Sequence, residues 1–124
     1  MKEIMPEELP FAEDMPYFKT SKSGIESWKD KIERLIEDNN GSVESFISGK
    51  VNGTRGVVIE FMMSGDRFRI QWPVLPSKKS GEETATMRQA VTMLYHDIKN
   101  SIGKVKIFGP KSTFLAYLVT AEGT

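Results

Sequence analysis

The sequence predicts an α+β fold, in which a three-stranded antiparallel meander carries two amphipathic helices on one face. Three observations predict it. Residues 57–74 read as a hairpin with one apolar face, residues 42–51 read as a strand joined to it by an Asn-Gly turn, and two further segments carry apolar stripes at helical spacing. The apolar faces have only each other to bury against, so both helices are expected on the same side of the sheet.

The hairpin is the most strongly specified element. Ser64 and Gly65 supply a two-residue turn, and side chains alternate between the faces of a strand. The resulting register places the large aromatic side chains on one face and pairs Glu60 with Arg69 on the other. The apolar face consists of Val57, Ile59, Phe61, Phe68, Ile70 and Trp72. The opposite face consists of Val58, Glu60, Met62, Arg67, Arg69 and Gln71.

Residues 1–22 are expected to form an extended or disordered N-terminal arm, and residues 23–124 a single domain. The arm contains three of the six prolines and has no helical or alternating period. Apolar side chains among acidic ones suit a segment that docks onto its own domain, a second subunit or another protein. The alternative is a loosely packed tail. The residues of this possible interaction arm are Leu9, Phe11, Met15, Tyr17 and Phe18.

The first helix is expected to begin at a capping box formed by Ser23 and Glu26, and to end at residues 39–41. The strand at 42–51 follows. A two-residue turn at Asn52-Gly53 would place Phe46 opposite Ile59, whereas one more loop residue would place Ile47 there. The pattern leaves both registers open.

The second helix is expected to begin at the capping box of Ser80 and Glu83 and to stop at Gly103. Its apolar stripe consists of Met87, Val91, Leu94, Ile98 and Ile102. Alternating lysine and aliphatic residues predict a short strand at 104–108. Pro110 suits the first position of a short final helix, although residues 110–118 also fit a strand, so the nature of the C-terminal extension stays open.

Length and composition predict one soluble domain of 124 residues and 14.0 kDa. The absence of cysteine excludes disulfides, thiolate chemistry and cysteine zinc sites. No apolar run approaches the ~20 residues of a membrane helix, and the acidic N-terminus is unlike a secretory signal, so a cytoplasmic protein without a membrane partner is expected. Residues 1–47 carry six basic and eleven acidic side chains, and residues 48–124 the reverse.

Catalytic patterns are sparse. His96 is the only histidine, and its neighbour Asp97 would point about 100° away from it on a helix. The chain has no glycine-rich phosphate loop, paired-carboxylate motif or metal-ligand spacing. These observations predict a protein that is not an enzyme and that uses neither a cofactor nor a metal.

Basic residues provide the candidate binding surface. Arg67, Arg69 and Gln71 share the outer face of the hairpin, and Lys78 and Lys79 precede a helix N-terminus, which favours anions. Arg88 lies further along that helix. Such residues could contact phosphates. The alternative is a solvated surface, because acidic residues lie close to both groups.

The helix, three strands, helix order over residues 23–102 resembles the double-stranded RNA-binding domain, and Lys78-Lys79 is similar to the basic helix start of that family. The resemblance implies RNA binding. The chain departs from the family in two places: the loop at 49–56 lacks the Gly-Pro-x-His type sequence, and the second helix lacks the Ala- and Lys-rich opening.

Residues 23–118 are also similar to short uncharacterised proteins of phages and prophages. The likeness lies in the αβββα layout, in Met87-Arg88-Gln89-Ala90 leading to Leu94, and in the aromatic segment Phe114-Leu115-Ala116-Tyr117-Leu118. It implies a phage or mobile-element origin, with no activity to transfer.

The leading hypothesis is therefore a small non-enzymatic accessory protein, derived from a phage or mobile element, that binds nucleic acid or a nucleic-acid-processing partner. The alternative is a protein–protein interaction or oligomerisation module that uses the N-terminal arm or a sheet edge. A homo-oligomer is compatible with either hypothesis.

Overall fold

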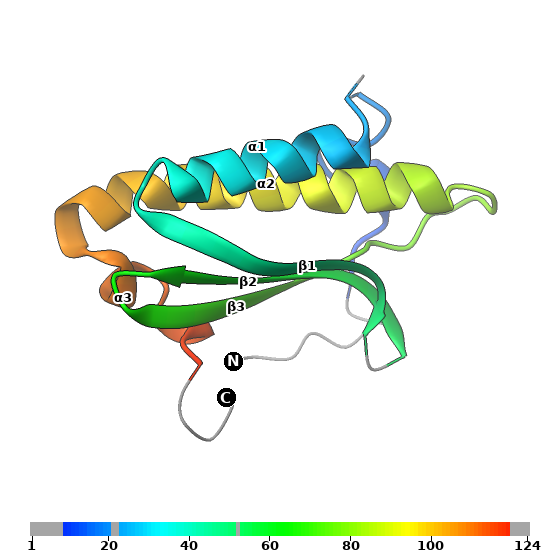
Figure 1. The fold of residues 1–124 in the computed structure, drawn as a ribbon. Coiled ribbons are helices and arrows are strands. Elements are labelled where there is room, and N and C mark those ends of the chain that lie inside the picture. Colours follow the sequence, from blue (N-terminus) through cyan, green and yellow to red (C-terminus); the bar gives the residue numbers. More distant parts are fainter. Residues whose placement is uncertain (1–8, 21–22, 52, 120–124) are drawn as a thin grey trace.

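The computed structural model describes residues 9–20, 23–51 and 53–119 (Figure 1). The elements in chain order are the 3-10 turn η2 (Ala12–Asp14), helix α1 (Ile25–Glu37), strands β1 (Gly41–Val51), β2 (Thr54–Met63) and β3 (Asp66–Pro73), helix α2 (Glu83–Phe108), the one-turn helix α3 (Pro110–Thr113) and the 3-10 turn η3 (Leu115–Tyr117). The strands form one antiparallel sheet in the order β1-β2-β3.

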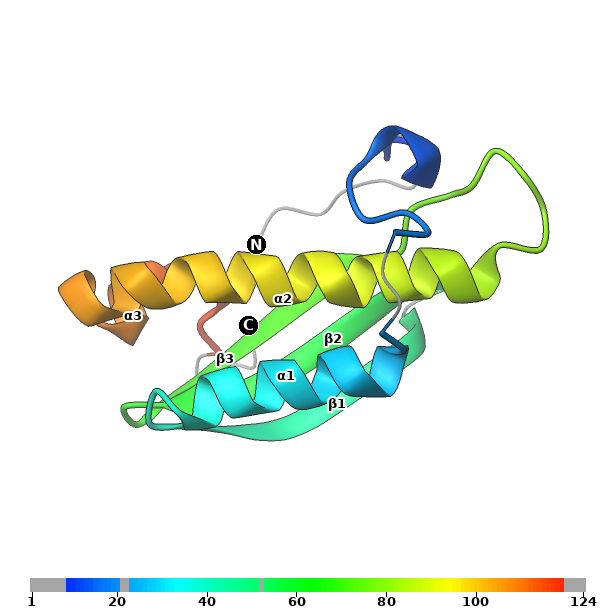
Figure 2. The same ribbon diagram turned by 90° about the horizontal axis from the view of Figure 1, so that it is seen from above.

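The predicted α+β layout is confirmed. Helices α1 and α2 lie side by side on one face of the sheet, α1 above β1 and α2 above the other two strands (Figures 1 and 2). The core fills the space between these two layers, as expected for elements that each have one apolar face. Its most buried side chains are Ile32, Ile36, Val57, Ile59, Phe61, Phe68, Ile70, Val91, Leu94, Ile98 and Phe114.

The predicted register of the hairpin is also confirmed. Val57 pairs with Trp72, and the ladder continues to Met63 opposite Asp66. The helix-facing side chains of β2 and β3 are buried, except that Trp72 is only partly covered. On the other face, Glu60 and Arg69 form the expected ion pair, with 2.7 Å between a guanidinium nitrogen and a carboxylate oxygen.

The register of β1 is the one that a two-residue turn requires. Val51 pairs with Thr54, Phe46 lies opposite Ile59, and Gly53 adopts a positive φ of 80°. A bulge interrupts the ladder between Val43 and Ser45. The extra residue in β1 is therefore Glu44.

Helix α1 begins one residue later than the capping box suggests, with Gly24 rather than Ser23 at the N-cap. Its C-terminal end is tightly joined to the sheet. A Cβ on Gly41 would lie 2.6 Å from Cγ2 of Ile36 and 2.9 Å from the carbonyl oxygen of Met62. Only glycine allows the backbone of β1 to approach α1 and β2 this closely.

Helix α2 corrects two predictions. It continues through Gly103 to Phe108, so residues 104–108 are helical rather than a strand. The physical reason is burial: Val105 packs against the core three residues after Ile102, and this contact outweighs the roughly 1 kcal/mol helix penalty of an exposed glycine. Gly109, with a positive φ of 84°, ends the helix instead. The N-cap is Glu82, not Ser80.

The C-terminal extension combines the two conformations that the sequence left open. Pro110 is the first residue of α3, as expected, and η3 follows it. Leu118 then forms an isolated antiparallel bridge with Phe68, and the backbone N–H of Val119 donates to the carbonyl oxygen of Arg67 at 2.9 Å. Phe114 is buried against the rings of Phe61 and Phe68. This segment therefore covers the outer edge of β3 at Arg67 and Phe68.

Candidate nucleic-acid interface

The structure places the predicted cations of the sheet on its helix-free face, where carboxylates neutralise them. Arg67 forms an ion pair with Glu44 at 3.0 Å, and Arg69 binds Glu60 through two guanidinium nitrogens at 2.7 and 2.8 Å. Gln71 is exposed beside them. With two arginines matched by two glutamates, this face offers little net charge to a phosphate backbone.

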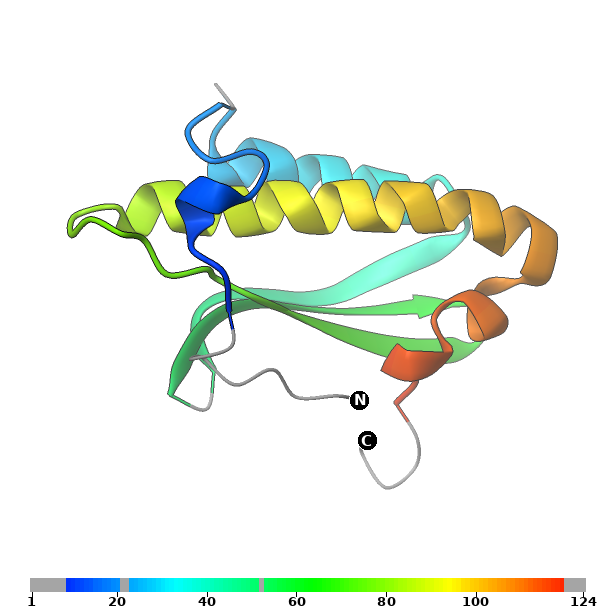
Figure 3. The same cartoon turned by 180° about the vertical axis from the view of Figure 1, so that it is seen from behind.

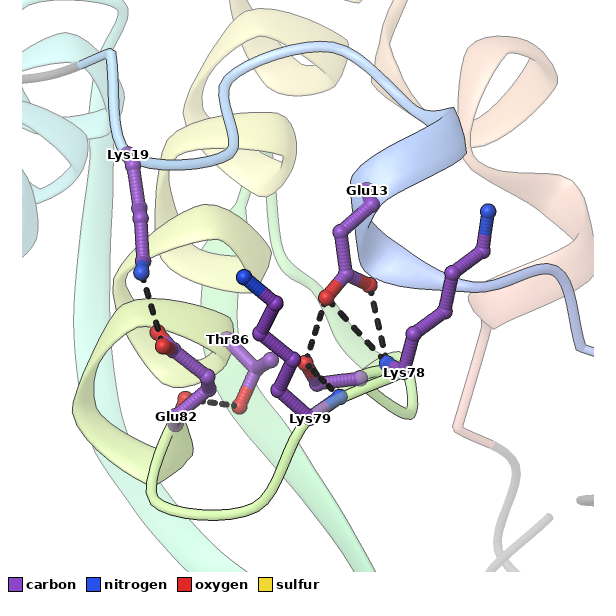
Figure 4. Close-up of polar contacts among 7 residues, drawn as sticks. Glu13, Lys19, Lys78, Lys79, Glu82 and Thr86 are labelled. Carbon is purple, nitrogen blue, oxygen red and sulfur yellow. Dashed lines mark hydrogen bonds and ion pairs between the residues drawn. The ribbon is translucent and has the colours of Figure 1, made fainter.

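The loop that holds Lys78 and Lys79 lies at the other end of the sheet, where α2 begins, so it does not form one patch with Arg67 (Figure 1). Lys78 forms an ion pair with Asp14 of the arm at 3.1 Å. Lys79 points into the space between the arm and the start of α2 (Figure 4). Within residues 9–20, 23–51 and 53–119, its ammonium group has no carboxylate partner.

Glu13 of the arm binds the loop that carries Lys78 and Lys79. Its carboxylate accepts a hydrogen bond of 2.6 Å from the Ser77 hydroxyl and bonds of 3.1 Å from the backbone N–H of Lys78 (Figure 4). The Ser77 hydroxyl bond, with a smaller contribution from Lys78, lowers the pKa of Glu13. Lys19 binds Glu82 at 2.7 Å on the far side of the site. Through the contacts of Glu13 and Lys19, the arm binds the start of α2 and the loop before it.

The described part of the arm therefore lies on its own domain, one of the three docking modes that the sequence left open. Ala12 is fully buried, and the side-chain amide of Gln89 on α2 donates to the carbonyl oxygens of Ala12 and Pro16 at 3.0 and 2.9 Å. The ring of Tyr17 stacks on His96 with centroids 4.7 Å apart. Met15 and Phe18 are partly buried, whereas Phe11 stays exposed.

Arg88 and His96, two polar residues of α2 that the sequence singled out, are partly buried. The Nε of Arg88 is buried and has no hydrogen-bond partner among the described residues. His96 lies among aromatic rings, with Trp28 at 5.9 Å and Tyr95 at 5.2 Å between centroids. In the part of the chain that the structure describes, no three His, Cys, Asp or Glu side chains are placed to hold a metal ion.

A shallow depression of about 110 Å³ lies where α2 begins, between Arg55, Lys79 and Thr86. Arg55 fills one side of it by donating to Thr86 Oγ1 at 3.2 Å and to the carbonyl oxygen of Glu83 at 2.7 Å. Sites for small molecules usually measure roughly 300–1,000 Å³. The depression is better suited to water or a side chain than to a substrate.

The end of α2 carries a surface that sequence reasoning missed. The last turns of α2 project past the sheet and past the end of α1 (Figures 1 and 2). Their apolar side chains are among the most exposed of the described residues: Ile107 is 76% exposed and Phe108 67%, and Leu115 on η3 is 61% exposed. We call this surface, together with the neighbouring lysines, the C-terminal surface. It consists of Lys104, Lys106, Ile107, Phe108, Lys111 and Leu115.

All charged side chains of the C-terminal surface are lysines, since residues 98–119 contain no Asp or Glu. None of its lysines forms an ion pair with a described carboxylate. Asp97, immediately before this stretch, is half-buried, and desolvation raises its pKa while Lys104 acts in the opposite direction. Desolvation, with a smaller contribution from the Asp97 carboxylate, raises the pKa of Tyr117. The absence of acidic residues from 98–119 could have indicated a basic surface from the sequence. The predicted strand at 104–108 did not bring these lysines together with exposed apolar side chains at the end of a helix.

Helical geometry groups part of this surface. Lys104 and Phe108 are four residues apart, and Ile107 is three residues after Lys104, so the three side chains share one face of α2. Among the helices described, none has both the length and the hydropathy to cross a bilayer.

Comparison of the chain with protein-family models, with curated proteins and with solved structures found no match.

Proposed function

We propose that this protein is a small binding protein that contacts single-stranded nucleic acid through the C-terminal surface. The observation that supports it is that Lys104 shares one face of the projecting end of α2 with the strongly exposed Ile107 and Phe108. Lys104, Lys106 and Lys111 have no carboxylate partner among the described residues. Lysines near a phosphate backbone release condensed counterions, and exposed rings stack on bases.

A single strand fits this surface better than a duplex. In a duplex the faces of the bases are stacked on each other, so that Phe108, Ile107 and Leu115 would meet only sugar and phosphate. Unpaired bases offer flat apolar faces that can cover these side chains, while their phosphates reach the lysines. The helix-free face of the sheet is a weaker alternative, because Arg67 and Arg69 are already paired with glutamates.

The test is a titration of labelled single-stranded DNA and RNA, and of a duplex of the same sequence, followed by fluorescence anisotropy at about 50 and about 200 mM salt. We expect binding to the single strands that weakens with salt, with a slope of log K on log salt of about −2 if all three lysines contact phosphates. Replacing Lys104, Lys106 and Lys111 with glutamine should remove most of this slope. Phe108→Ala should reduce affinity by about 1–3 kcal/mol and leave the slope unchanged.

The matched control removes the same charge elsewhere, with Arg67, Lys78 and Lys79 replaced by glutamine. This variant should bind like the parent protein. Loss of binding in the control but not in the C-terminal variant would move the interface to the residues first indicated by the sequence. Absence of binding at low salt would refute the proposal, as would binding to anionic lipid vesicles but not to oligonucleotides.

A further inference from the structure

We infer that the site on α2 and the preceding loop, which the arm occupies, recognises an extended acidic peptide of another protein. We call it the arm site, and it consists of Ser77, Lys78, Gln89 and His96. Residues 9–20 are then an intramolecular occupant that such a peptide displaces. The inference is independent of the nucleic-acid proposal, because the arm site lies towards the start of α2 and the C-terminal surface at its end (Figure 3).

Main-chain groups of the arm make its central contacts. The side-chain amide of Gln89 donates to the carbonyl oxygens of Ala12 and Pro16 at 3.0 and 2.9 Å, and the backbone N–H of Ala12 donates to the carbonyl oxygen of Pro76 at 2.7 Å. Every peptide carries such backbone groups. These bonds therefore give affinity for an extended chain in general, and the side chains of the peptide give the specificity.

Three side chains of the arm define the peptide that fits. Ala12 is fully buried, so the site admits a small residue at this position. The carboxylate of Glu13, the next residue, accepts hydrogen bonds from the loop. The ring of Tyr17 then lies nearly parallel to that of His96, with 4.7 Å between centroids and an angle of 9°. The pattern is a small residue, an acidic residue directly after it, and an aromatic residue one arm position beyond Pro16.

The arm fills this site incompletely. Gln89 is 1% exposed, yet its Oε1 accepts no hydrogen bond from the described residues. A buried acceptor without a donor costs free energy, which a ligand recovers by bringing a donor. Tyr17 and Lys19 also have left-handed φ angles of 71° and 58°, which side chains other than glycine rarely adopt. The arm turns here because it returns across α2 to the start of α1 (Figure 2), whereas a separate peptide has no such constraint.

The ion pairs that hold the arm are exposed to solvent. The side chains of Lys78 and Asp14 are 51% and 55% exposed, and that of Lys19 is 53% exposed. Exposed pairs contribute little stability. Within residues 9–20, Ala12 alone is fully buried. A peptide with better contacts can therefore replace the arm without unfolding the core.

The tether selects another protein rather than a second copy as the source of the peptide. An arm from a second copy brings the same side chains and the same backbone, and no additional donor for Gln89. It competes with an arm whose effective concentration, for a short linker, is on the order of millimolar. An identical segment therefore loses to the arm of the same chain, whereas a peptide that satisfies Gln89 has an advantage.

The test is the binding of a labelled peptide with the sequence of residues 9–20 to the full chain, followed by fluorescence anisotropy. In the double variant Glu13→Gln, Tyr17→Ala, the arm loses its side-chain contacts while the arm site is unchanged. We expect the double variant to bind the peptide at least roughly tenfold more tightly than the parent chain, in which the tethered arm competes. Adding Gln89→Ala should remove this gain, whereas adding Gln71→Ala, at an exposed glutamine, should not. Far-UV circular dichroism verifies that the variants are folded.

Peptide variants test the pattern on one unchanged protein, the double variant. Peptides with Ala12→Leu, Glu13→Gln or Tyr17→Ala should each bind several-fold more weakly than the parent peptide, and a scrambled peptide should not bind. Equal binding by the parent chain and the double variant, no binding to the double variant at about millimolar peptide, or tight binding of the scrambled peptide would overturn the inference. So would a doubling of the 14.0 kDa mass in sedimentation equilibrium that the double variant abolishes, because the occupant would then be a second copy.

Discussion

The two long sides of the molecule differ in how the chain reinforces them. On the side of α2 and β3, both terminal segments pack back (Figure 3). The arm lies on α2 and on the loop after β3, and the C-terminal extension covers the start of the edge of β3. On the side of α1 and β1, the described residues add no such cover, and Ile47 is left exposed. One side of the sheet is therefore reinforced by the terminal segments of the chain, whereas the edge of β1 depends on its pairing with β2 and its packing against α1.

The reinforced side depends most on Phe114. Phe114→Ala removes a ring that is 1% exposed and contacts Phe61 and Phe68 with centroid distances of 5.4 and 5.5 Å. We expect the free energy of unfolding to fall by about 3–5 kcal/mol, because the transfer free energy is lost and a cavity remains. Urea unfolding followed by circular dichroism measures it. The exposed neighbour provides the control: Leu115→Ala should change stability by less than about 0.5 kcal/mol, and equal losses in the two variants would contradict the role of Phe114.

The open side depends on the close approach at Gly41. Gly41→Ala puts a Cβ 2.6 Å from Ile36 Cγ2 and 2.9 Å from a backbone oxygen, so α1 and β1 must separate. The expected destabilisation is about 1–3 kcal/mol, measured by thermal unfolding. Gly103→Ala is the matched control. Its Cβ meets nothing within 4 Å, and alanine in a helix interior should stabilise by about 0.5–1 kcal/mol. A loss of stability at Gly103 would indicate that α2 does not continue as a helix there.

The docking of the arm depends on Gln89. Gln89→Ala removes the hydrogen bonds to the carbonyl oxygens of Ala12 and Pro16, so the docked arm should be less stable by about 1–2 kcal/mol. Limited proteolysis should then cleave within residues 9–20 roughly tenfold faster, with little change in global unfolding. Gln71→Ala, at an exposed glutamine on the sheet, is the control. Unchanged cleavage in Gln89→Ala would show that the arm is held by its other contacts.

The smallest effect is the pH dependence of the same docking. The pKa of Glu13 is lower in the folded protein than its ordinary value of 4.5, chiefly because the Ser77 hydroxyl donates to the carboxylate. A lowered folded pKa contributes stability that is present above the ordinary value and is lost as the pH falls through the folded value. Protease protection of the arm should therefore exceed that of Glu13→Gln at neutral pH, and the two should converge in acid. A difference that persists in strong acid would contradict this mechanism.

Sequence reasoning worked where the signal was local and where one face had to be buried. The register of β2 and β3 followed from a two-residue turn and alternating aromatic side chains, because a slip by one residue would expose the whole apolar face. It failed at residues 104–108, where the local alternation and Gly103 indicated a strand after a helix stop. The contact of Val105 with a core assembled from distant residues decided the conformation. Local signals cannot report such a contact.

For the candidate site, the sequence pointed to cations of the hairpin and to an apolar arm, without showing what they contact. In the structure, ion pairs with Glu44 and Glu60 neutralise Arg67 and Arg69, and Gln89 holds the arm on α2. The C-terminal surface became visible only once α2 was seen to project beyond the sheet. The sequence by itself determined the αβββα order, the hairpin and the apolar faces, because these depend on neighbours in the chain. Only the tertiary structure decided which charges are paired, which edge is covered and which apolar side chains stay in solvent, because each depends on what distant segments cover.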